Sequence, residues 1–314
     1  SDWSSDVCSS DLKLSIIIKG INNMSELKDE SKDFVLTAVK KNGYELENAS
    51  EKHQNDKDIV LSAVNATGFA LTYASEELKN DKEVVLAAVS VDGNALSSAS
   101  EGLKGDKEVV LAAIKERGDA LRYASEELKN NKDVVLIAVS VNGTALSFTS
   151  DELKDDEDVV LIAVRNQGMA LNYASDRFKS NKEFVFEMVK KDGDALEYAS
   201  DEIRNDREVV LAAVANSREA FDETSEEFRG DKEIALVAVK NNAYTLIEAS
   251  DELRNDKEVV LVAVNQVGSL LEFASKNLRN DKEVVLAAIK NEEWALEYAS
   301  KKLQKDSDIK SAIS

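Results

Sequence analysis

Residues 106–130 read DKEVVLAAIKERGDALRYASEELKN, and copies of this pattern make up nearly all of the chain. Eleven blocks of 25 residues follow one another from Ser31 to Lys305 without insertion or deletion. Tandem units of this length are typical of solenoid proteins, in which each repeat buries its apolar residues against its neighbours. The sequence therefore predicts an all-α fold, an α-solenoid of about eleven 25-residue helical repeats. Residues are numbered below by position in the repeat, with Asp106 at position 1.

The first half of each repeat predicts the longer of two helices. Positions 4–9 are almost all apolar, as in Val109 to Ile114, and six consecutive apolar residues cover the whole circumference of a helix. We therefore expect an inner helix that is buried on both sides. The residue before position 1, such as Asn80, is the expected N-cap, because an acidic residue (Glu83) follows at the spacing of a capping box.

The second half predicts a short helix and a capped turn. Glycine occupies position 13 in eight repeats, and a glycine just past a helix end is typical of a left-handed C-terminal cap. Position 20 is serine in all eleven repeats and mostly precedes acidic residues, which is the pattern of an N-cap. Leucine at position 23 is expected to return to the core. We expect slightly altered corners in the three repeats without the glycine, at Arg218, Ala243 and Glu293.

The two ends of the chain depart from the pattern. Residues 2–12 resemble a translated sequencing-library adapter, which indicates an assembled or metagenomic gene, so residues 1–12 are treated as a non-native scar. Residues 13–30 resemble a degenerate, truncated repeat. Residues 306–314 are expected to form a partial C-terminal capping repeat, in which Lys310, Ser311 and Ser314 replace apolar residues. We then expect Ser314 to be the native end and the genuine N-terminus to be missing, so that a cytoplasmic and a secreted location both fit.

Composition argues against several classes of function. The net charge of -21 opposes binding to nucleic acid and to anionic membrane surfaces. The only cysteine, Cys8, lies in the adapter-like segment, and the only histidine, His53, has no histidine or cysteine partner for metal binding or catalysis. We therefore expect no enzyme, no cofactor, no metal site, no nucleic-acid partner and no membrane insertion, and we expect a monomer.

The pattern DKEVVLAAV, then glycine, then ALxYASEELKND resembles the repeat of the family called domain of unknown function 4116. The resemblance covers Ser31 to about Ile313. It implies an all-helical tandem-repeat array and transfers no activity, cofactor or ligand to any position. His53 at the leucine position and Arg218 at the glycine position are local departures from the pattern.

Three other features invite a functional interpretation, but a structural one fits each of them better. His53 is expected to be a partly exposed substitution, and the serine column lacks a histidine base and is expected to cap helices. The acidic rows at positions 1, 3, 21 and 22 alternate with Lys or Arg at 2 and 24, so we expect weak exposed ion pairs. Recruitment of a basic partner or of divalent cations by positions 21 and 22 is the alternative. The aromatic column at position 18 is expected in the core, with its hydroxyls reaching the surface: Tyr73, Tyr123, Phe148, Tyr173, Tyr198, Phe273 and Tyr298.

The repeats differ most around the glycine, at positions 10–12, 14 and 17, which we name the Gly-corner ridge. Variation on one edge of a fixed scaffold indicates a recognition surface, and large apolar residues at position 14 are typical interface anchors. The leading hypothesis is a scaffold that binds a protein or peptide along this ridge. Drift at unconstrained sites explains the variation equally well, and a structural spacer or surface rod without a specific partner is the alternative function. The candidate partner-binding residues are Tyr44, Phe69, Met169, Tyr244, Trp294, Arg165 and Lys290.

Overall fold

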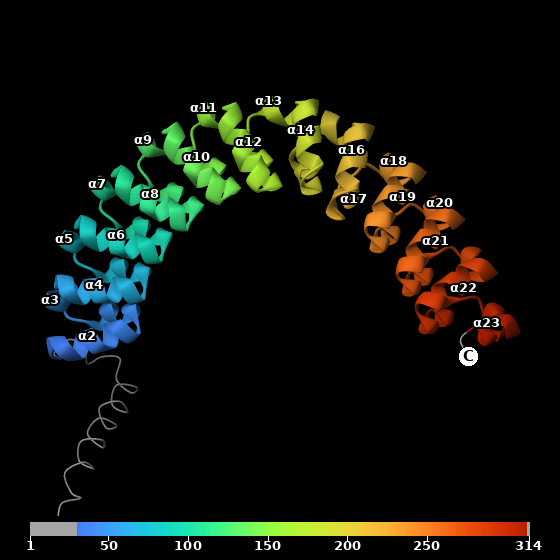
Figure 1. Cartoon of the computed structure of the whole chain (residues 1–314), viewed down its shortest axis with the longest axis horizontal. Helices are drawn as coiled ribbons and strands as arrows, with labels where there is room; N and C mark the ends of the chain where they lie inside the picture. The colour runs from blue at the N-terminus through green and yellow to red at the C-terminus, as the bar shows by residue number, and fades with distance from the viewer. Residues whose placement is uncertain (1–29, 313–314) are drawn as a thin grey trace, which may run out of the picture. The chain divides into compact units, whose positions relative to one another are not determined.

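The computed structural model describes residues 30–312 and contains no β-strand among them. The chain divides after Ser150 into two compact units, residues 1–150 and 151–314. Each unit is a stack of repeats, and each repeat has three helical parts (Figure 1). The strongest contacts join elements of the same repeat or of adjacent repeats, for example α4 (Lys57–Ala66) with α6 (Lys82–Val91). The prediction of an all-α solenoid is confirmed.

The long helices occupy positions 2–11 of most repeats. In the first unit they are α2 (Lys32–Lys41), α4, α6, α8 (Lys107–Glu116) and α10 (Lys132–Val141). In the second unit they are α12 (Glu157–Asn166), α14 (Lys182–Val189), α16 (Arg207–Val214), α19 (Lys232–Asn241), α21 (Lys257–Gln266) and α22 (Lys282–Asn291), followed by the shorter α23 (Ser307–Ser311).

The predicted short helix is a 3₁₀ helix over positions 13–18 in most repeats. The first unit contains η1 (Gly43–Asn48), η2 (Gly68–Tyr73), η3 (Gly93–Ser98), η4 (Gly118–Tyr123) and η5 (Gly143–Phe148). The second contains η6 (Gly168–Tyr173), η7 (Gly193–Tyr198), η8 (Ala243–Ile247), η9 (Gly268–Phe273) and η11 (Glu293–Tyr298), with the α-helix α17 (Glu219–Asp222) in place of one 3₁₀ helix.

The predicted capped turn is a single helical turn over positions 21–24. It is α-helical in α3 (Glu51–Gln54), α5 (Glu76–Lys79), α7 (Glu101–Lys104) and α9 (Glu126–Lys129) of the first unit. The second unit has α11 (Asp151–Lys154), α13 (Asp176–Lys179), α15 (Asp201–Arg204), α18 (Glu226–Arg229) and α20 (Asp251–Arg254), then the 3₁₀ turns η10 (Leu278–Asn280) and η12 (Leu303–Lys305).

The N-cap prediction for the long helix was wrong by one residue. Asp81, at position 1, caps α6: its Oδ1 accepts the N–H groups of Glu83 at 3.0 Å and of Val84 at 3.1 Å. Asn80, the predicted cap, instead ends the preceding turn, and its Oδ1 accepts the Ser100 hydroxyl of the next repeat at 2.6 Å. Position 1 is therefore the N-cap of the long helix, and the side chain at position 25 forms a hydrogen bond to the next repeat.

The prediction that the long helix is buried all round was also wrong. In α6, Val84, Val85, Ala88 and Val89 are fully buried, whereas Leu86 and Ala87 are half-buried. Positions 4, 5, 8 and 9 face the neighbouring elements, because α6 packs on α4, on α8 and on the 3₁₀ helices of its own and the preceding repeat. Positions 6 and 7 lie on a face that neighbouring elements cover only in part.

Glycine at position 13 is needed for a different reason from the one predicted. None of the glycines described at this position has a left-handed φ. A Cβ built on Gly93 would instead lie less than 3.0 Å from the carbonyl oxygen of Ala113, at position 8 of the next repeat. The same clash recurs at Gly43, Gly68, Gly118, Gly193 and Gly268. The glycine therefore allows the next long helix to approach closely.

The three repeats without this glycine differ from one another. At Arg218 the corner is rebuilt: α16 ends early, Arg218 is exposed, and α17 replaces the 3₁₀ helix. At Ala243 the change is small, because η8 is only one residue shorter. At Glu293 the helix η11 keeps the usual bounds, and Glu293 is exposed where glycine is buried elsewhere. The expectation of slight alterations thus underestimated Arg218 and overestimated Glu293.

The serine at position 20 joins adjacent repeats as well as capping a turn. Its Oγ accepts the N–H of position 23, as predicted, at 3.4 Å for Ser100 and Leu103. Its own N–H donates to the position 24 carbonyl of the preceding repeat, at 3.0 Å from Ser100 to Lys79. This backbone bond recurs along both units, but within the described residues none forms at Ser225, in the repeat that also has the rebuilt corner.

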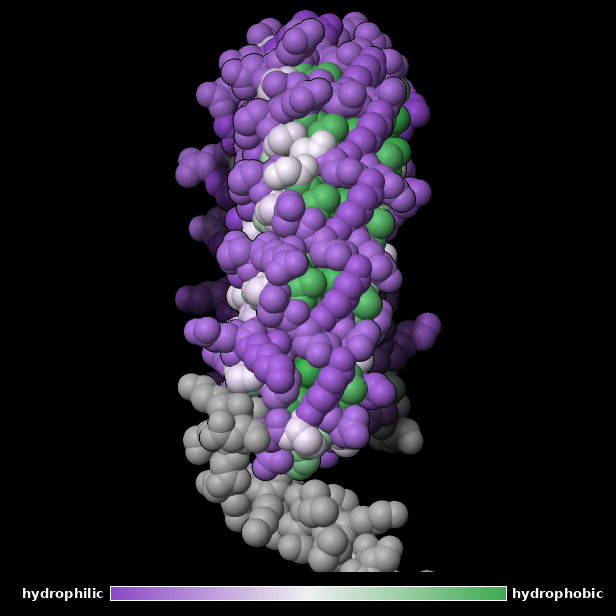
Figure 2. Space-filling view, turned by 90° about the vertical axis from the view of Figure 1, so that its left-hand side faces the viewer, coloured by the Kyte–Doolittle hydropathy of each residue, from purple (hydrophilic) through white to green (hydrophobic). Residues whose placement is uncertain are grey.

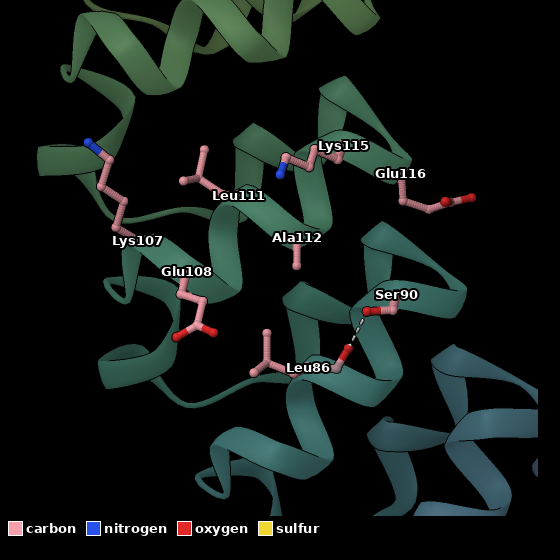
Figure 3. Close-up of a pocket in the computed structure, with 8 residues that line it drawn as sticks. All are labelled: Leu86, Ser90, Lys107, Glu108, Leu111, Ala112, Lys115 and Glu116. Carbon is pink, nitrogen blue, oxygen red and sulfur yellow. Dashed lines mark hydrogen bonds between the residues drawn. The ribbon is translucent and has the colours of Figure 1, made fainter.

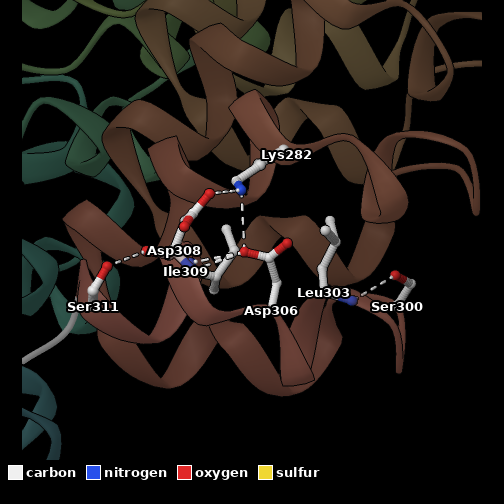
Figure 4. A network of polar contacts seen from close by, with 7 residues as sticks. All are labelled: Lys282, Ser300, Leu303, Asp306, Asp308, Ile309 and Ser311. Carbon is white, nitrogen blue, oxygen red and sulfur yellow. Dashed lines mark hydrogen bonds and ion pairs between the residues drawn. The ribbon is translucent and has the colours of Figure 1, made fainter.

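The charged rows form two sets of ion pairs. At position 2, Lys57 reaches the next repeat and contacts Asp81 at 2.7 Å and Glu83 at 2.8 Å, and at the C-terminal end of the stack Lys282 contacts Asp306 and Asp308 in the same way (Figure 4). At position 24 the cation pairs within its own turn, with the acid three residues earlier. The pairs are less exposed than predicted, because the Lys79 side chain is only 19% exposed and that of Asp81 only 27%, and the position 2 pairs also connect neighbouring repeats.

Two predictions of burial were wrong. His53 is 8% exposed rather than partly exposed, and its Nδ1 lies 3.1 Å from the Ser50 hydroxyl. The aromatic residues of position 18 are half-buried rather than part of the core, and Arg122, for example, lies 5.1 Å from the ring centre of Tyr123 and 5.7 Å from that of Phe148.

Figure 2 shows a mostly hydrophilic face on which small apolar areas recur along the stack. Lys310 and Ser311 of the C-terminal partial repeat are exposed, whereas Ile309 beside them is buried. No helix within residues 30–312 is long and apolar enough to cross a membrane. The interpretations of residues 1–12, of 13–29 and of Ser314 lie outside the described residues.

Candidate functional site

The large apolar side chains of position 14 lie on the surface, as expected for the Gly-corner ridge. Their exposed fractions range from 37% for Phe69 to 54% for Trp294, with Tyr44, Met169 and Tyr244 in between. The glycine or alanine directly before four of them is buried. The chain therefore turns a large apolar side chain outward at the point where its backbone packs against the next repeat.

Local structure explains this outward direction. Position 14 is the second residue of the 3₁₀ helix, and position 12 is its N-cap. The Asn42 Oδ1 accepts the N–H of Tyr44 at 3.2 Å, and Asn242 does the same for Tyr244 at 3.0 Å. Position 12 was predicted to vary freely, yet Asn or Asp there caps the 3₁₀ helix in several repeats.

The structure brings only some of the candidate residues together. Tyr44 and Phe69 lie in adjacent repeats, on the contacting helices η1 and η2. In the second unit, Met169, Tyr244 and Trp294 come from repeats that are not adjacent to one another. The Trp294 ring packs edge-on against Tyr298, with the ring centres 5.9 Å apart. The ridge thus presents separate anchors rather than one continuous apolar patch.

The two cationic candidates, Arg165 and Lys290, occupy position 10 near the end of a long helix, and both are exposed. The Arg165 carbonyl oxygen accepts a hydrogen bond from the Lys191 Nζ at 2.5 Å. No described contact joins either cation to the position 14 side chain of its own repeat.

Two further ridge residues were missed. Val91 and Val141, at position 11, are 43% and 42% exposed. Together with the five anchors they make seven of the eight large hydrophobic side chains exposed within the described residues; the eighth is Ile162, on the open face of α12. The sequence signal for them was a valine at position 11, where most repeats have a polar residue. Exposed apolar side chains are therefore concentrated on the Gly-corner ridge.

Charges on the ridge differ between repeats. In the repeat 106–130, Arg117 Nε lies 3.4 Å from Asp119 Oδ1, so that the acid at position 14 is paired.

Next to Trp294, burial raises the pKa of Tyr298, and the Glu272 and Glu297 carboxylates raise it further. The phenol therefore stays protonated at neutral pH and can donate a hydrogen bond.

A groove of about 680 Å³ lies on a different face, between α6 and α8 (Figure 3). Leu86, Leu111 and Ala112 supply its apolar lining, at positions 6 and 7, and Lys107 and Glu108 lie at one end. The same positions recur in neighbouring repeats, so this groove reflects the open face of the long helices. Within residues 30–312, no group of His, Cys, Asp or Glu side chains is arranged to hold a metal ion.

A family model described as Domain of unknown function (DUF4116) matches the chain in eight overlapping segments. Most segments span about two repeats, and the matches reach from residue 31 to residue 304: 31–76, 56–104, 106–154, 142–179, 156–204, 181–229, 231–279 and 256–304. A comparison with curated proteins finds no match. The resemblance identified from the repeat pattern is thereby confirmed.

Proposed function

The chain belongs to the family called domain of unknown function 4116, and we propose that it is a non-enzymatic helical-repeat scaffold that binds a protein or peptide partner along its Gly-corner ridge. One observation carries this proposal: seven of the eight exposed large hydrophobic side chains of residues 30–312 lie at positions 11 and 14. Exposed tyrosine, tryptophan and methionine are the side chains that most often anchor protein interfaces.

Hydrophobic side chains scattered singly are normal on a protein surface, but seven of the eight large ones exposed within residues 30–312 lie at only two positions of the repeat. Tyr44, Tyr244 and Trp294 are large and apolar, and their removal leaves no cavity in the core. Their retention at the surface is therefore better explained by contact with a partner than by the folding of the repeat.

The test is a pull-down with the full chain carrying Tyr44→Ala, Tyr244→Ala and Trp294→Ala together. We expect the partners captured by the wild type to be lost. Ile162→Ala is the control, since Ile162 is exposed and apolar but lies away from the ridge. Unchanged capture by the triple variant would favour a spacer without a specific partner.

The proposed partner is not a nucleic acid. The net charge of -21 disfavours nucleic acid, and we propose that the partner is a protein or peptide. We also propose that the chain binds it as a monomer. A catalytic role would require carboxylates from several repeats to act together. An activity screen that detects turnover, abolished by one Asp or Glu substitution, would contradict the non-enzymatic assignment.

A further inference from the structure

Position 11 of the Gly-corner ridge carries hydrogen-bond donors in the second unit. There its side chain donates to a carbonyl at the C-terminal end of the long helix of the preceding repeat. Four such bonds form, from Lys191 to Arg165, from Asn241 to Val214, from Gln266 to Val239 and from Asn291 to Asn265, with distances from 2.5 Å for Lys191 to 3.3 Å for Asn241. The ends of α12, α16, α19 and α21 therefore receive a donor from within the chain.

The first unit has no such donor at position 11. The side chains that correspond there, next to the ends of α2, α4, α6 and α8, cannot donate a hydrogen bond: Ala66, Val91, Glu116 and Val141. Within residues 30–150, no described hydrogen bond from another repeat reaches the carbonyls of Val64 and Asn65, which lie near the end of α4. The last carbonyls of a helix carry partial negative charge and take donors from side chains, water or a ligand. The end of α4 is therefore accessible to a donor from another molecule.

Two exposed apolar side chains, Phe69 and Val91, lie near this uncapped helix end. The chain segments that carry them are in contact, because a Cβ built on Gly68 would lie 2.9 Å from the backbone nitrogen of Asp92. Phe69 directly follows this glycine, and Val91 directly precedes this aspartate. Their side chains are 37% and 43% exposed. The end of α4 thus combines carbonyls that lack a donor with an aromatic and an aliphatic surface.

The other helix ends of the molecule do not offer this combination. In the second unit the repeat after Met169 supplies Lys191, so the donor is already present beside that anchor. In the first unit the ends of α6 and α8 have Asn94 and Asp119 at position 14 in place of an apolar anchor. The Lys191 ammonium also shows which chemistry fits an end of this kind. A cation suits the partial negative charge of a helix C-terminus and the net charge of -21.

We propose that the end of α4, together with Phe69 and Val91, binds a lysine that lies beside an apolar residue in a peptide segment of the partner. The lysine ammonium donates to the Asn65 carbonyl, as the Lys191 ammonium donates to that of Arg165 at the equivalent position 10. The apolar neighbour and the aliphatic part of the lysine pack on Phe69 and Val91. This inference rests on the proposed function, because it assigns a chemical class to the partner at one place on the ridge.

The test uses the full chain and a fluorescein-labelled peptide in which one lysine lies between two leucines, with norleucine in place of the lysine in the negative peptide. Anisotropy is measured at physiological ionic strength. We expect Val91→Gln to weaken binding of the lysine peptide about tenfold, because the new amide caps α4 as Gln266 caps α19 and so removes a charge-assisted contact. The norleucine peptide should bind the wild type about tenfold more weakly for the same reason.

Two control variants separate the helix end from the apolar surface. Val91→Glu introduces a side chain of nearly the same shape as glutamine but without a donor, so it should weaken binding less than about threefold, through lost apolar contact alone. Val141→Gln makes the same substitution beside Asp119 instead of an aromatic anchor, and it should change the affinity less than about twofold. Val91→Gln should melt at a temperature no lower than the wild type, because glutamine is native at this position in Gln266.

Equal weakening by Val91→Gln and Val91→Glu would overturn the proposal, because it would show that the helix end does not bind the lysine. Equal weakening by Val91→Gln and Val141→Gln would overturn it as well, as would equal binding of the two peptides, absence of lysine-peptide binding, or a lower melting temperature of Val91→Gln.

The pull-down distinguishes this failure from failure of the proposed function. If the lysine peptide fails to bind while the Tyr44, Tyr244 and Trp294 variant still loses its captured partners, only the assignment at the end of α4 is wrong. If the peptide binds as expected and the triple variant keeps its partners, the assignment at α4 is supported and the role of the three anchors is not.

Discussion

Positions 13 and 14 are neighbours in sequence and opposite in role. Gly93 is fully packed against the next repeat, as are the glycines equivalent to it, whereas the side chains that follow at position 14 are exposed or half-buried and vary from tryptophan to serine. We call positions 1, 13 and 20 the joint positions, because each contacts an adjacent repeat. In each repeat, the residues that pack against the adjacent repeat are therefore different from those that form the exposed ridge, although the two sets are neighbours in sequence.

The largest predicted effect is at a joint glycine. Gly93→Ala places a Cβ against the Ala113 carbonyl, and because backbone cannot move aside easily we expect a loss of about 1–3 kcal/mol in the free energy of unfolding. Gly102→Ala, in the same repeat, is the control: its Cβ would meet nothing closer than 3.9 Å, so it should be neutral or stabilising. Urea denaturation measures both. Equal stability of Gly93→Ala and wild type would remove the joint role of the glycine.

The joint serine comes next. Ser100→Ala removes the hydroxyl that caps α7 and donates to Asn80, and we expect a loss of about 1 kcal/mol by urea denaturation. Ser90→Ala is its control, since Ser90 is an exposed residue of α6 that only bonds its own helix. If the two alanine variants are equally stable, the serine has no measurable effect on the joint.

A smaller effect, dependent on pH, is predicted at position 1. Hydrogen bonding to Lys57 holds the pKa of Asp81 below its ordinary value, and the bonds from the Val84 and Glu83 N–H groups add to this against the opposing effect of burial. A carboxylate with a lowered pKa stabilises the fold above its unfolded pKa of about 4, and the stabilisation is lost as pH falls through the folded pKa. Asp81→Asn keeps the cap, as Asn131 does naturally, but loses the charge.

Thermal melts of Asp81→Asn and wild type should therefore differ at pH 7 and converge as the pH falls through the lowered pKa of Asp81. A difference between the two that stays constant from neutral to acid pH would show that the ion pair between repeats does not contribute.

The smallest effect on stability is expected on the ridge. Tyr244→Ala should change the free energy of unfolding by less than about 0.5 kcal/mol, because the side chain is exposed. Leu246→Ala, two residues later and fully buried, should cost about 2–5 kcal/mol in the same urea titration. A large loss of unfolding free energy in Tyr244→Ala would show that the ridge anchors stabilise the folded repeat. It would also remove the main argument for a binding role.

The repeat period and its apolar pattern predicted the fold and its three-part repeat, because both follow from residues close together in sequence. Two of the errors share a cause. Gly93 was interpreted as a left-handed cap and Asn80 as the N-cap of the long helix, both within one repeat. Their main partners are atoms of adjacent repeats, and a pattern that recurs identically in every copy does not distinguish a partner in the same copy from one in the next.

The candidate site was predictable to a similar extent. Exposure of the position 14 anchors could be predicted, since a large residue after a corner glycine has no core position to occupy. The groove of about 440 Å³ beside Met169 could not, because Asp192, Asp194, Glu219 and Glu223 in its lining occupy positions 12, 14, 14 and 18 of two repeats. Only the shortened α14 and the rebuilt corner at Arg218 bring these positions around one groove.

The central claim, that each repeat folds only against its neighbours, is tested most directly by circular dichroism of the synthetic peptide 106–130 beside the full chain. Its longest helix has 10 residues, which is below the length of about 12–15 residues at which isolated helices become marginally stable in water. We predict an unfolded spectrum for the peptide and a strongly helical spectrum for the full chain. A peptide with the same helical signal per residue as the full chain would contradict the claim.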